Sequence, residues 1–235
     1  MGNFTSALSW FTYNVNTRQD VTFDQLTLIT GSDKIYSAGV VANSTTATSS
    51  NGPITGSFNV TQASLTTSNA LIDVDLNIFQ KEGEVYDGMS AVMTTSNGAV
   101  KANVGLYYSN DTHLDAQGGK FDLVTSTHNA LINLQFATAP VDSILGCSVS
   151  TSNGPTDVHL HPTYEGSLTL FTSNGETEIH ENDKLEDPSG RGRSRVVEWN
   201  RRWKLWSIGW VGWGEKKKAG QLVVKTSNGG NTLWL

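Results

Sequence analysis

The sequence contains a single cysteine, Cys147, so an intrachain disulfide is excluded. No run approaches the roughly 18 apolar residues that a membrane-spanning helix needs. Charged residues make up only 16% of the 235 residues, whereas Ser, Thr, Asn and Gly are abundant. This composition is typical of a β-rich, extracellular-looking protein rather than of a helical cytosolic enzyme. The length suits one large all-β domain or two small ones.

Basic residues are scarce over most of the chain. Residues 1–180 hold 16 acidic and 5 basic side chains, whereas residues 181–235 hold 6 acidic and 11 basic ones. A nucleic-acid-binding protein is usually basic over its main body, so nucleic acid is not an expected partner.

The N-terminus lacks the basic and apolar regions of a signal peptide. Either the protein is not secreted, or a targeting segment is absent from this chain. Four Asn-x-Ser/Thr sequons would be glycosylated only in the secretory path, at Asn3, Asn43, Asn59 and Asn110. We favour an extracellular or cell-surface location.

Familiar catalytic motifs are also missing. There is no G-x-S-x-G elbow, and T-S-N-G lacks the Lys and the helix of a phosphate-binding loop. Cys147 aligns with Leu168 and Leu222, each six residues before its repeat asparagine, which predicts a buried, unreactive thiol. We therefore expect neither enzymatic activity nor a cofactor.

What the chain does contain is a repeated tetrapeptide, T-S-N-G, with Ser32 in the asparagine slot of a degenerate first copy. The shortest spacing is 18, and longer gaps carry insertions at 79–90, 107–119 and 181–220. We divide the chain into a lead-in or cap (1–24), a repeat domain (25–180), a charged and Trp-rich insertion (181–220) and a final repeat (221–235). The key asparagines are Asn51, Asn69, Asn97, Asn129, Asn153, Asn174 and Asn228.

The flanks of the tetrapeptide alternate between apolar and polar residues. After Asn69, Ile72, Val74 and Leu76 are apolar, and the acidic residues Asp73 and Asp75 lie between them. The same offsets are apolar around most of the other copies. Alternation with period two predicts a β-strand with one buried face on each side of every tetrapeptide.

Two all-β architectures fit this pattern. Asn-Gly between alternating strands is a hairpin signal, which leads to an antiparallel β-sandwich. Alternatively, strand, corner and strand form one rung of a β-solenoid with about eight rungs. We favour the solenoid, because the tetrapeptide hardly varies and because Ala70 and Ala130 replace a Gly that a tight hairpin turn requires. Stacked rungs would align the asparagines in a ladder, with Asn153 beside Asn174.

The repeats resemble fungal proteins built from S/T-S-N-G β-strand repeats, which are similar to bacterial adhesin-like β-strand-repeat domains. The resemblance covers roughly residues 25–180 and 206–235 and rests on stretches such as SSNGPITGSFNV, TSNGPTDVHL and AGQLVVKTSNGGNTLWL. It implies an all-β repeat domain without an assigned enzymatic activity. The tract at 191–206 lies outside the pattern, so the resemblance implies nothing about its role.

Four side chains form a candidate metal site. His159 and His180 each follow their asparagine by six residues, and Asp157 and Glu178 each follow by four. If the two rungs are neighbours, these ligands converge and suit Zn²⁺ or another divalent ion. The simpler interpretation is a solvated face with His–carboxylate pairs, which we favour because metal geometry needs supporting contacts.

A Trp-rich tract at 190–218 departs from the repeat pattern. Its tryptophans are spaced by 4, 3, 4 and 3 residues, which suits an amphipathic interfacial helix, although Gly209 and Gly212 oppose one. A strand over 206–213 is the alternative. As a surface, the tract could bind a sugar, a polyanion or a membrane; as a cap, it covers the repeat body. The candidate binding residues are Trp199, Arg201, Arg202, Trp203, Trp206, Trp210 and Trp213.

We favour the cap, since clustered exposed tryptophans are an aggregation liability. It predicts that Trp210 and Trp213 are at least partly buried, whereas Arg201, Arg202 and Lys204 stay solvated. For the whole protein we predict a non-catalytic, surface or cell-wall-associated structural or adhesive role with a glycan or cell-surface partner. The alternatives are a carbohydrate-binding or polysaccharide-active β-helix and an ice- or surface-binding Thr/Ser face.

Overall fold

A computed structural model describes residues 2–17, 21–84, 89–110, 117–182, 184–214 and 219–235. The predicted all-β class is confirmed: the described residues form 18 strands and no helix, hence no helix able to span a membrane. The strands are β1 (Gly2–Ala7), β2 (Tyr13–Val15), β3 (Thr22–Thr30), β4 (Ile35–Ser49), β5 (Ile54–Thr67), β6 (Ile72–Lys81), β7 (Ala91–Thr94), β8 (Val100–Ser109), β9 (Lys120–Ser126), β10 (Ile132–Thr138), β11 (Ile144–Ser150), β12 (Thr156–His159), β13 (Gly166–Thr172), β14 (Thr177–His180), β15 (Arg195–Arg202), β16 (Trp206–Trp213), β17 (Gly220–Thr226) and β18 (Asn231–Trp234).

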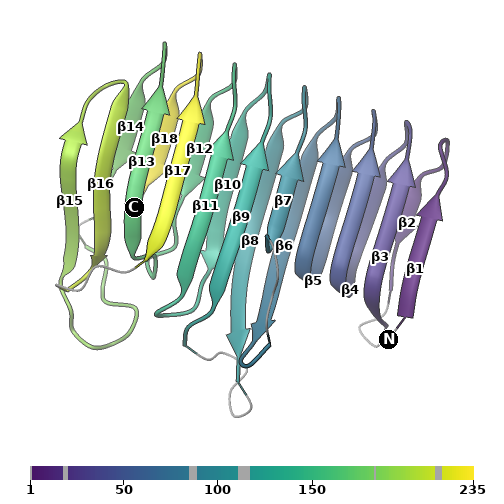
Figure 1. The fold of residues 1–235 in the computed structure, drawn as a ribbon, viewed down its shortest axis with the longest axis horizontal. Helices are drawn as coiled ribbons and strands as arrows, with labels where there is room; N and C mark the ends of the chain where they lie inside the picture. Colours follow the sequence, from purple (N-terminus) through teal and green to yellow (C-terminus); the bar gives the residue numbers. More distant parts are fainter. Residues whose placement is uncertain (1, 18–20, 85–88, 111–116, 183, 215–218) are drawn as a thin grey trace.

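The strands lie in two facing layers that meet at the tetrapeptide corners (Figure 1). The inbound layer contains the strands that lead into a corner: β1, β3, the second halves of β4 and β5, β7, β9, β11, β17 and β13. The outbound layer contains those that leave it: β2, the first halves of β4 and β5, β6, β8, β10, β12, β18 and β14. One passage through an inbound strand, a corner and an outbound strand is called a rung below.

Neighbouring rungs pair in parallel and in register. Ile54 lies beside Ile72, Ile72 beside Val100, and Val100 beside Ile132. Among the described residues, the only antiparallel pairings join β13 to β16 and β16 to β15. Because both layers keep one register, the apolar positions of every rung align and form one continuous core. That core includes Leu65, Leu76, Leu134 and Leu170, all without solvent exposure.

Stacking order differs from chain order at the C-terminal end. Strand β17 pairs with β11 on one side and with β13 on the other, and β18 likewise lies between β12 and β14. The amide of Asn228 therefore bonds to Asn153 (2.7 Å) and accepts from Asn174 (2.8 Å). The expected contact between Asn153 and Asn174 is wrong, because the last repeat of the chain fills the space between their rungs.

Three of the four residues of the tetrapeptide have separate roles in the stack. Thr95 is buried, and its hydroxyl donates to the carbonyl of Ala70 in the preceding rung (3.2 Å). Asn97 is exposed, and its amide donates to the side chain of Asn69 (2.7 Å). A Cβ on Gly98 would lie 1.7 Å from the Ala70 oxygen, so Gly is needed at that corner. The hydroxyl and amide bonds recur from rung to rung, which explains why the tetrapeptide hardly varies.

Cys147 follows the predicted alignment. It lies level with Leu123 and Leu222 in the neighbouring strands and is buried. Burial raises the pKa of its thiol to about 12, because the thiolate would lose its hydration. The reactive thiolate is therefore scarce at neutral pH, as expected for a packing residue.

Candidate binding surfaces

The four predicted metal ligands do not converge. Trp234 of the inserted rung lies between the two histidines: its ring stacks on His159 at 5.2 Å between centroids and on His180 at 3.8 Å. Each histidine contacts the acid two positions before it, Asp157 at 3.2 Å and Glu178 at 3.3 Å. The described residues hold no cluster of three or more His, Cys, Asp or Glu that could bind a metal. The prediction that His159 and His180 are direct neighbours, on which the metal hypothesis depends, is therefore wrong.

This arrangement is a His–Trp–His stack on the outer face of the outbound layer. The indole N–H of Trp234 donates to Asp157 Oδ1 at 2.9 Å, so one carboxylate holds both the indole and His159. The stack arises from strand order alone, because β18 brings Trp234 between β12 and β14. The Nε2 atoms of both histidines and the indole nitrogen already contact carboxylates of the protein.

The Trp-rich tract forms an antiparallel β-hairpin, β15–β16, and not a helix. Its glycines explain the preference: a Cβ on Gly209 would lie 2.5 Å from the ring of Trp199, so Gly209 provides the space that this ring occupies. The predicted burial of Trp210 and Trp213 is observed, with exposed fractions of 8% and 2%. The indole N–H of Trp213 donates to the carbonyl of Pro162 at 2.8 Å. The inner half of the tract therefore packs on the repeat body and is not available to a ligand.

A buried ionic network fastens this hairpin to the body. Arg193 contacts Asp187 at 3.0 Å and Glu165 at 3.2 Å, and both carboxylates are almost fully buried. Glu165 also accepts the backbone N–H of Trp213 at 2.9 Å. The hydrogen bonds from Arg193, helped by those from Ser189, hold the pKa of Asp187 well below its usual range. The network joins the segment 187–193 to Glu165, the residue before β13, and to the end of β16.

The outer half of the tract carries the candidate binding residues that remain accessible. Trp203 is 62% exposed, and the guanidinium of Arg201 lies 5.0 Å from its ring and 4.9 Å from that of Trp206. Arg202 lies 5.7 Å from the ring of Trp199 and forms a 2.8 Å ion pair with Glu181.

The prediction that Arg201, Arg202 and Lys204 stay solvated is confirmed, since all three are exposed, although two of them have acidic partners. Arg202 pairs with Glu181, and Lys204 pairs with Glu176, although both basic side chains stay more than half exposed. The acids are the residues directly before and directly after β14. Arg202 and Lys204 are therefore neutralised by nearby acids, whereas Arg201 keeps its positive charge and stacks on the rings of Trp203 and Trp206.

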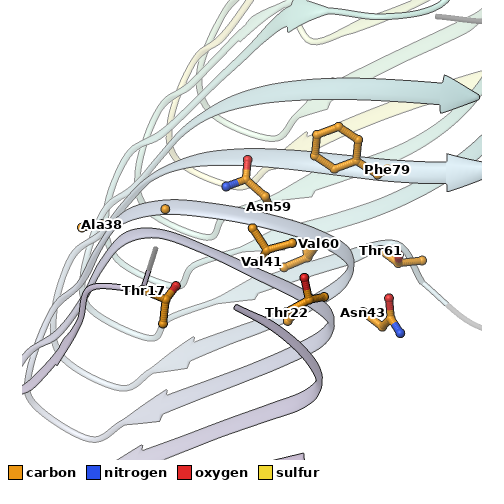
Figure 2. Close-up of a pocket in the computed structure, with 11 residues that line it drawn as sticks. Thr17, Thr22, Ala38, Val41, Asn43, Asn59, Val60, Thr61 and Phe79 are labelled. Atoms are coloured by element: carbon orange, nitrogen blue, oxygen red, sulfur yellow. The ribbon is translucent and has the colours of Figure 1, made fainter. Parts of the chain in front are cut away.

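A groove of about 510 Å³ lies at the opposite end of the molecule, where β4 and β5 bend from the outbound to the inbound layer. Figure 2 shows Val41 and Val60 between Asn59 and Phe79 on one side and Thr22 and Asn43 on the other. The lining residues are Thr17, Thr22, Ala38, Gly39, Val41, Ala42, Asn43, Asn59, Val60, Thr61 and Phe79, and none of them is ionisable.

Two contacts hold the groove's side chains in place. The Asn59 amide donates to the carbonyl of Val40 at 3.3 Å and accepts from Asn77 at 3.0 Å. The ring of Phe79 is 44% exposed and stacks on Tyr107, with 4.7 Å between centroids and an interplanar angle of 12°. Both contacts link neighbouring rungs, so the side chains that face the groove are pre-positioned.

The four predicted glycosylation asparagines differ in accessibility. Asn3 and Asn43 are exposed, whereas Asn59 and Asn110 are half-buried. The Asn59 amide nitrogen already donates to Val40, so a glycan there would displace a cross-strand hydrogen bond. A glycan on Asn43 would lie at the groove.

Sequence reasoning missed the groove. Its residues come from four separate segments, and the bulge that shapes its wall occurs at Gly39, whose φ is +101°. The only available signal was an exposed aromatic, Phe79, at a position that alternation assigns to the solvent face. No family model, curated protein or solved structure matches this chain. The resemblance to S/T-S-N-G repeat proteins therefore stays a prediction.

Proposed function

We propose that the chain is a β-solenoid with a non-catalytic, adhesive role, and that its groove binds an uncharged carbohydrate. The parallel pairing of successive strand–corner–strand units in one register supports the solenoid. Antiparallel pairing is limited to the β13–β16–β15 edge in the described part of the chain. Such a stack is a rigid support on which a surface-exposed site keeps its shape.

The observation that carries the ligand assignment is the chemistry of the groove lining. Phe79 presents an exposed aromatic ring, on which the C–H face of a sugar can pack. Asn59 and Asn43 place amides around the apolar floor, and Thr22 adds a hydroxyl. Binding sites typically combine apolar walls with a few placed polar groups of this kind.

The described lining residues are uncharged, which favours a neutral carbohydrate. Anionic sugars are typically recognised by Arg or Lys, which form charge-assisted hydrogen bonds with carboxylate or sulfate. Neither residue type is among the lining residues that the structure describes. Those residues also include no carboxylate pair of the kind that glycoside hydrolysis uses.

A neutral-glycan array, followed by calorimetry on the best binder, tests this proposal. Phe79→Ala should weaken binding about tenfold, since an aromatic contact is worth on the order of 1 kcal/mol. Phe171→Ala is the matched control, because Phe171 has a similar exposed fraction, 41%, and lies in the inbound layer. Equal affinities for the two variants, or no neutral glycan bound by the parent protein, would refute the proposal.

A second candidate function rests on the outer face of the inbound layer. A row of hydroxyl side chains crosses five successive strands in register and ends at Lys225. Strands spaced by about 4.8 Å make this row regular, a property that suits binding to an ordered surface such as ice. Thermal hysteresis that disappears in Thr66→Lys would favour this function over the groove. The row consists of Thr48, Thr66, Thr94, Ser126 and Ser150.

A further inference from the structure

The N-terminal end of the stack has open β-edges. Strand β1 pairs with β3, and β2 pairs with β4; among the described residues neither has a strand on its other side (Figure 1). An edge strand presents unpaired N–H and C=O groups that a further strand can satisfy. The stack thus continues its hydrogen-bonding pattern right up to a surface that another β-strand would fit.

In residues 2–17, as the structure describes them, the features that commonly protect an edge strand are absent. Proteins that stay monomeric commonly protect edges with charged side chains or proline. Residues 1–17 contain no charged side chain and no proline. Four large apolar side chains are exposed there, which in a soluble protein commonly marks an interaction site. They are Phe4, Leu8, Trp10 and Phe11.

At the opposite end of the stack, the edge strand carries charged side chains of this protective kind. This strand, β15, carries Arg195, Glu198, Arg201 and Arg202. The register of β15 also shifts between Trp199 and Arg201, which interrupts the regular edge. A head-to-tail contact would join the unprotected edge of β1 to the protected edge of β15, so filament growth is disfavoured. A contact between the β1 edges of two copies meets no protected edge.

Charge is compatible with the same partner. Residues 1–180 carry 16 acidic and 5 basic side chains, so the acidic parts of two repeat bodies repel each other. Residues 1–17 carry no charged side chain, so two copies that meet through these residues bring no like-charged side chains of this segment together. Pairing like ends about a two-fold axis runs the two β1 strands antiparallel and closes the assembly at two copies.

We propose that two copies of this chain associate through β1, edge to edge, to form a head-to-head dimer. Leu8 donates its backbone N–H to Ile29 of β3. Since successive residues of a strand bond to opposite sides, the backbone groups of Thr5 and Ala7 face the open edge. This pairing does not depend on the proposed carbohydrate site.

Sedimentation velocity from 1 to 100 µM tests the dimer. The parent protein should shift toward twice its 25.4 kDa mass as concentration rises. Thr5→Lys introduces an edge charge, and Thr5→Pro removes an outward-facing N–H while leaving the β1–β3 bonds in place; both should stay at the monomer mass. Thr5→Val, which changes neither, is the control and should dimerise.

Hydrogen exchange on the same samples identifies the edge that is used. Amides of β1 should become protected at high concentration, whereas those of β15 should not change. A parent protein that stays monomeric at 100 µM would overturn the proposal. Protection of β15, growth beyond two copies, or unchanged dimerisation of folded Thr5→Lys and Thr5→Pro would do so as well.

Discussion

The two ends of the stack differ in how far their aromatic side chains and strand edges are covered. Both are rich in aromatic residues, yet Trp10 at the N-terminal end is 77% exposed and Trp213 at the C-terminal end is 2% exposed. The C-terminal end is covered by the β15–β16 hairpin and fastened by Arg193, whereas the N-terminal end finishes on edge strands. An aromatic cluster in the sequence is therefore not enough to identify a cap. At the C-terminal end, the cap is identified by the hairpin strands, which pair antiparallel and not in parallel as the rungs do.

The ends also differ in how the chain reaches them. At the N-terminal end, stacking order follows chain order, so β1 and β2 have one pairing partner each. At the C-terminal end, β13 to β16 come before β17 and β18 in sequence, yet β17 lies between β11 and β13 in the stack. The C-terminal residues are therefore interior in the stack, although they are terminal in sequence.

The largest contrast is expected from deletions. Removing residues 220–235 should abolish cooperative unfolding of the C-terminal end, because β17 and β18 each pair on two sides. Leu222, Val224 and Leu233 are fully buried, at about 1.5–3 kcal/mol each, which is a large share of a typical stability of about 5–15 kcal/mol.

Removing residues 1–17 should leave a cooperative transition, because only single-sided pairings are lost. Urea titrations followed by circular dichroism compare the two deletions. Equal losses of stability would show that the inserted repeat is not the interior element described above.

Substitution of one tryptophan at each end compares how much the two ends contribute to the free energy of unfolding. Trp213→Ala should destabilise the protein by about 3–5 kcal/mol, the usual cost of emptying a core Trp site. Trp10→Ala should change the free energy of unfolding by no more than about 0.5 kcal/mol, because its side chain is largely in water. Denaturant unfolding at low protein concentration measures both without contribution from self-association. A neutral Trp213→Ala would rule out the cap.

A smaller, pH-dependent effect is expected from Asp187. Its pKa is lowered in the folded protein, mainly by Arg193, so in the unfolded chain it takes up a proton at higher pH. Its contribution to stability is present above the unfolded value of about 3.9 and is lost as pH falls through and below that value. Melting temperatures from pH 6 to pH 2 should therefore fall less steeply for Asp187→Asn than for the parent protein. If the melting temperatures of both proteins fell equally with pH, the ion pair of Asp187 with Arg193 would not contribute to stability.

The smallest effect is expected at the tip of the hairpin. Trp203→Ala should cost at most about 1 kcal/mol, since the side chain is mostly exposed and its contact with Arg201 is a surface cation–π pair. Thermal unfolding beside Trp213→Ala separates the outer half of the tract from the inner half. A loss as large as that of Trp213→Ala would mean that the whole tract acts as the cap.

Local features were predictable because they depend on neighbours in sequence or on a repeated register. Alternation placed Leu65 and Leu76 in the core, and alignment with leucines placed Cys147 there. For the tract at 206–213 the sequence signals conflict, since its tryptophan spacing suits a helix and its glycines a strand. The strand formed because Gly209 leaves room for the ring of Trp199 across the hairpin.

By itself, the sequence determined the strands, their buried faces and the corner chemistry, because side-chain alternation and the T-S-N-G bonds recur in most rungs. Only the tertiary structure decided which rungs are neighbours. Any repeat can pair with any other that shares its register, so chain order does not specify stacking order. For that physical reason Trp234, and not His180, lies beside His159, and the groove combines residues that no sequence motif connects.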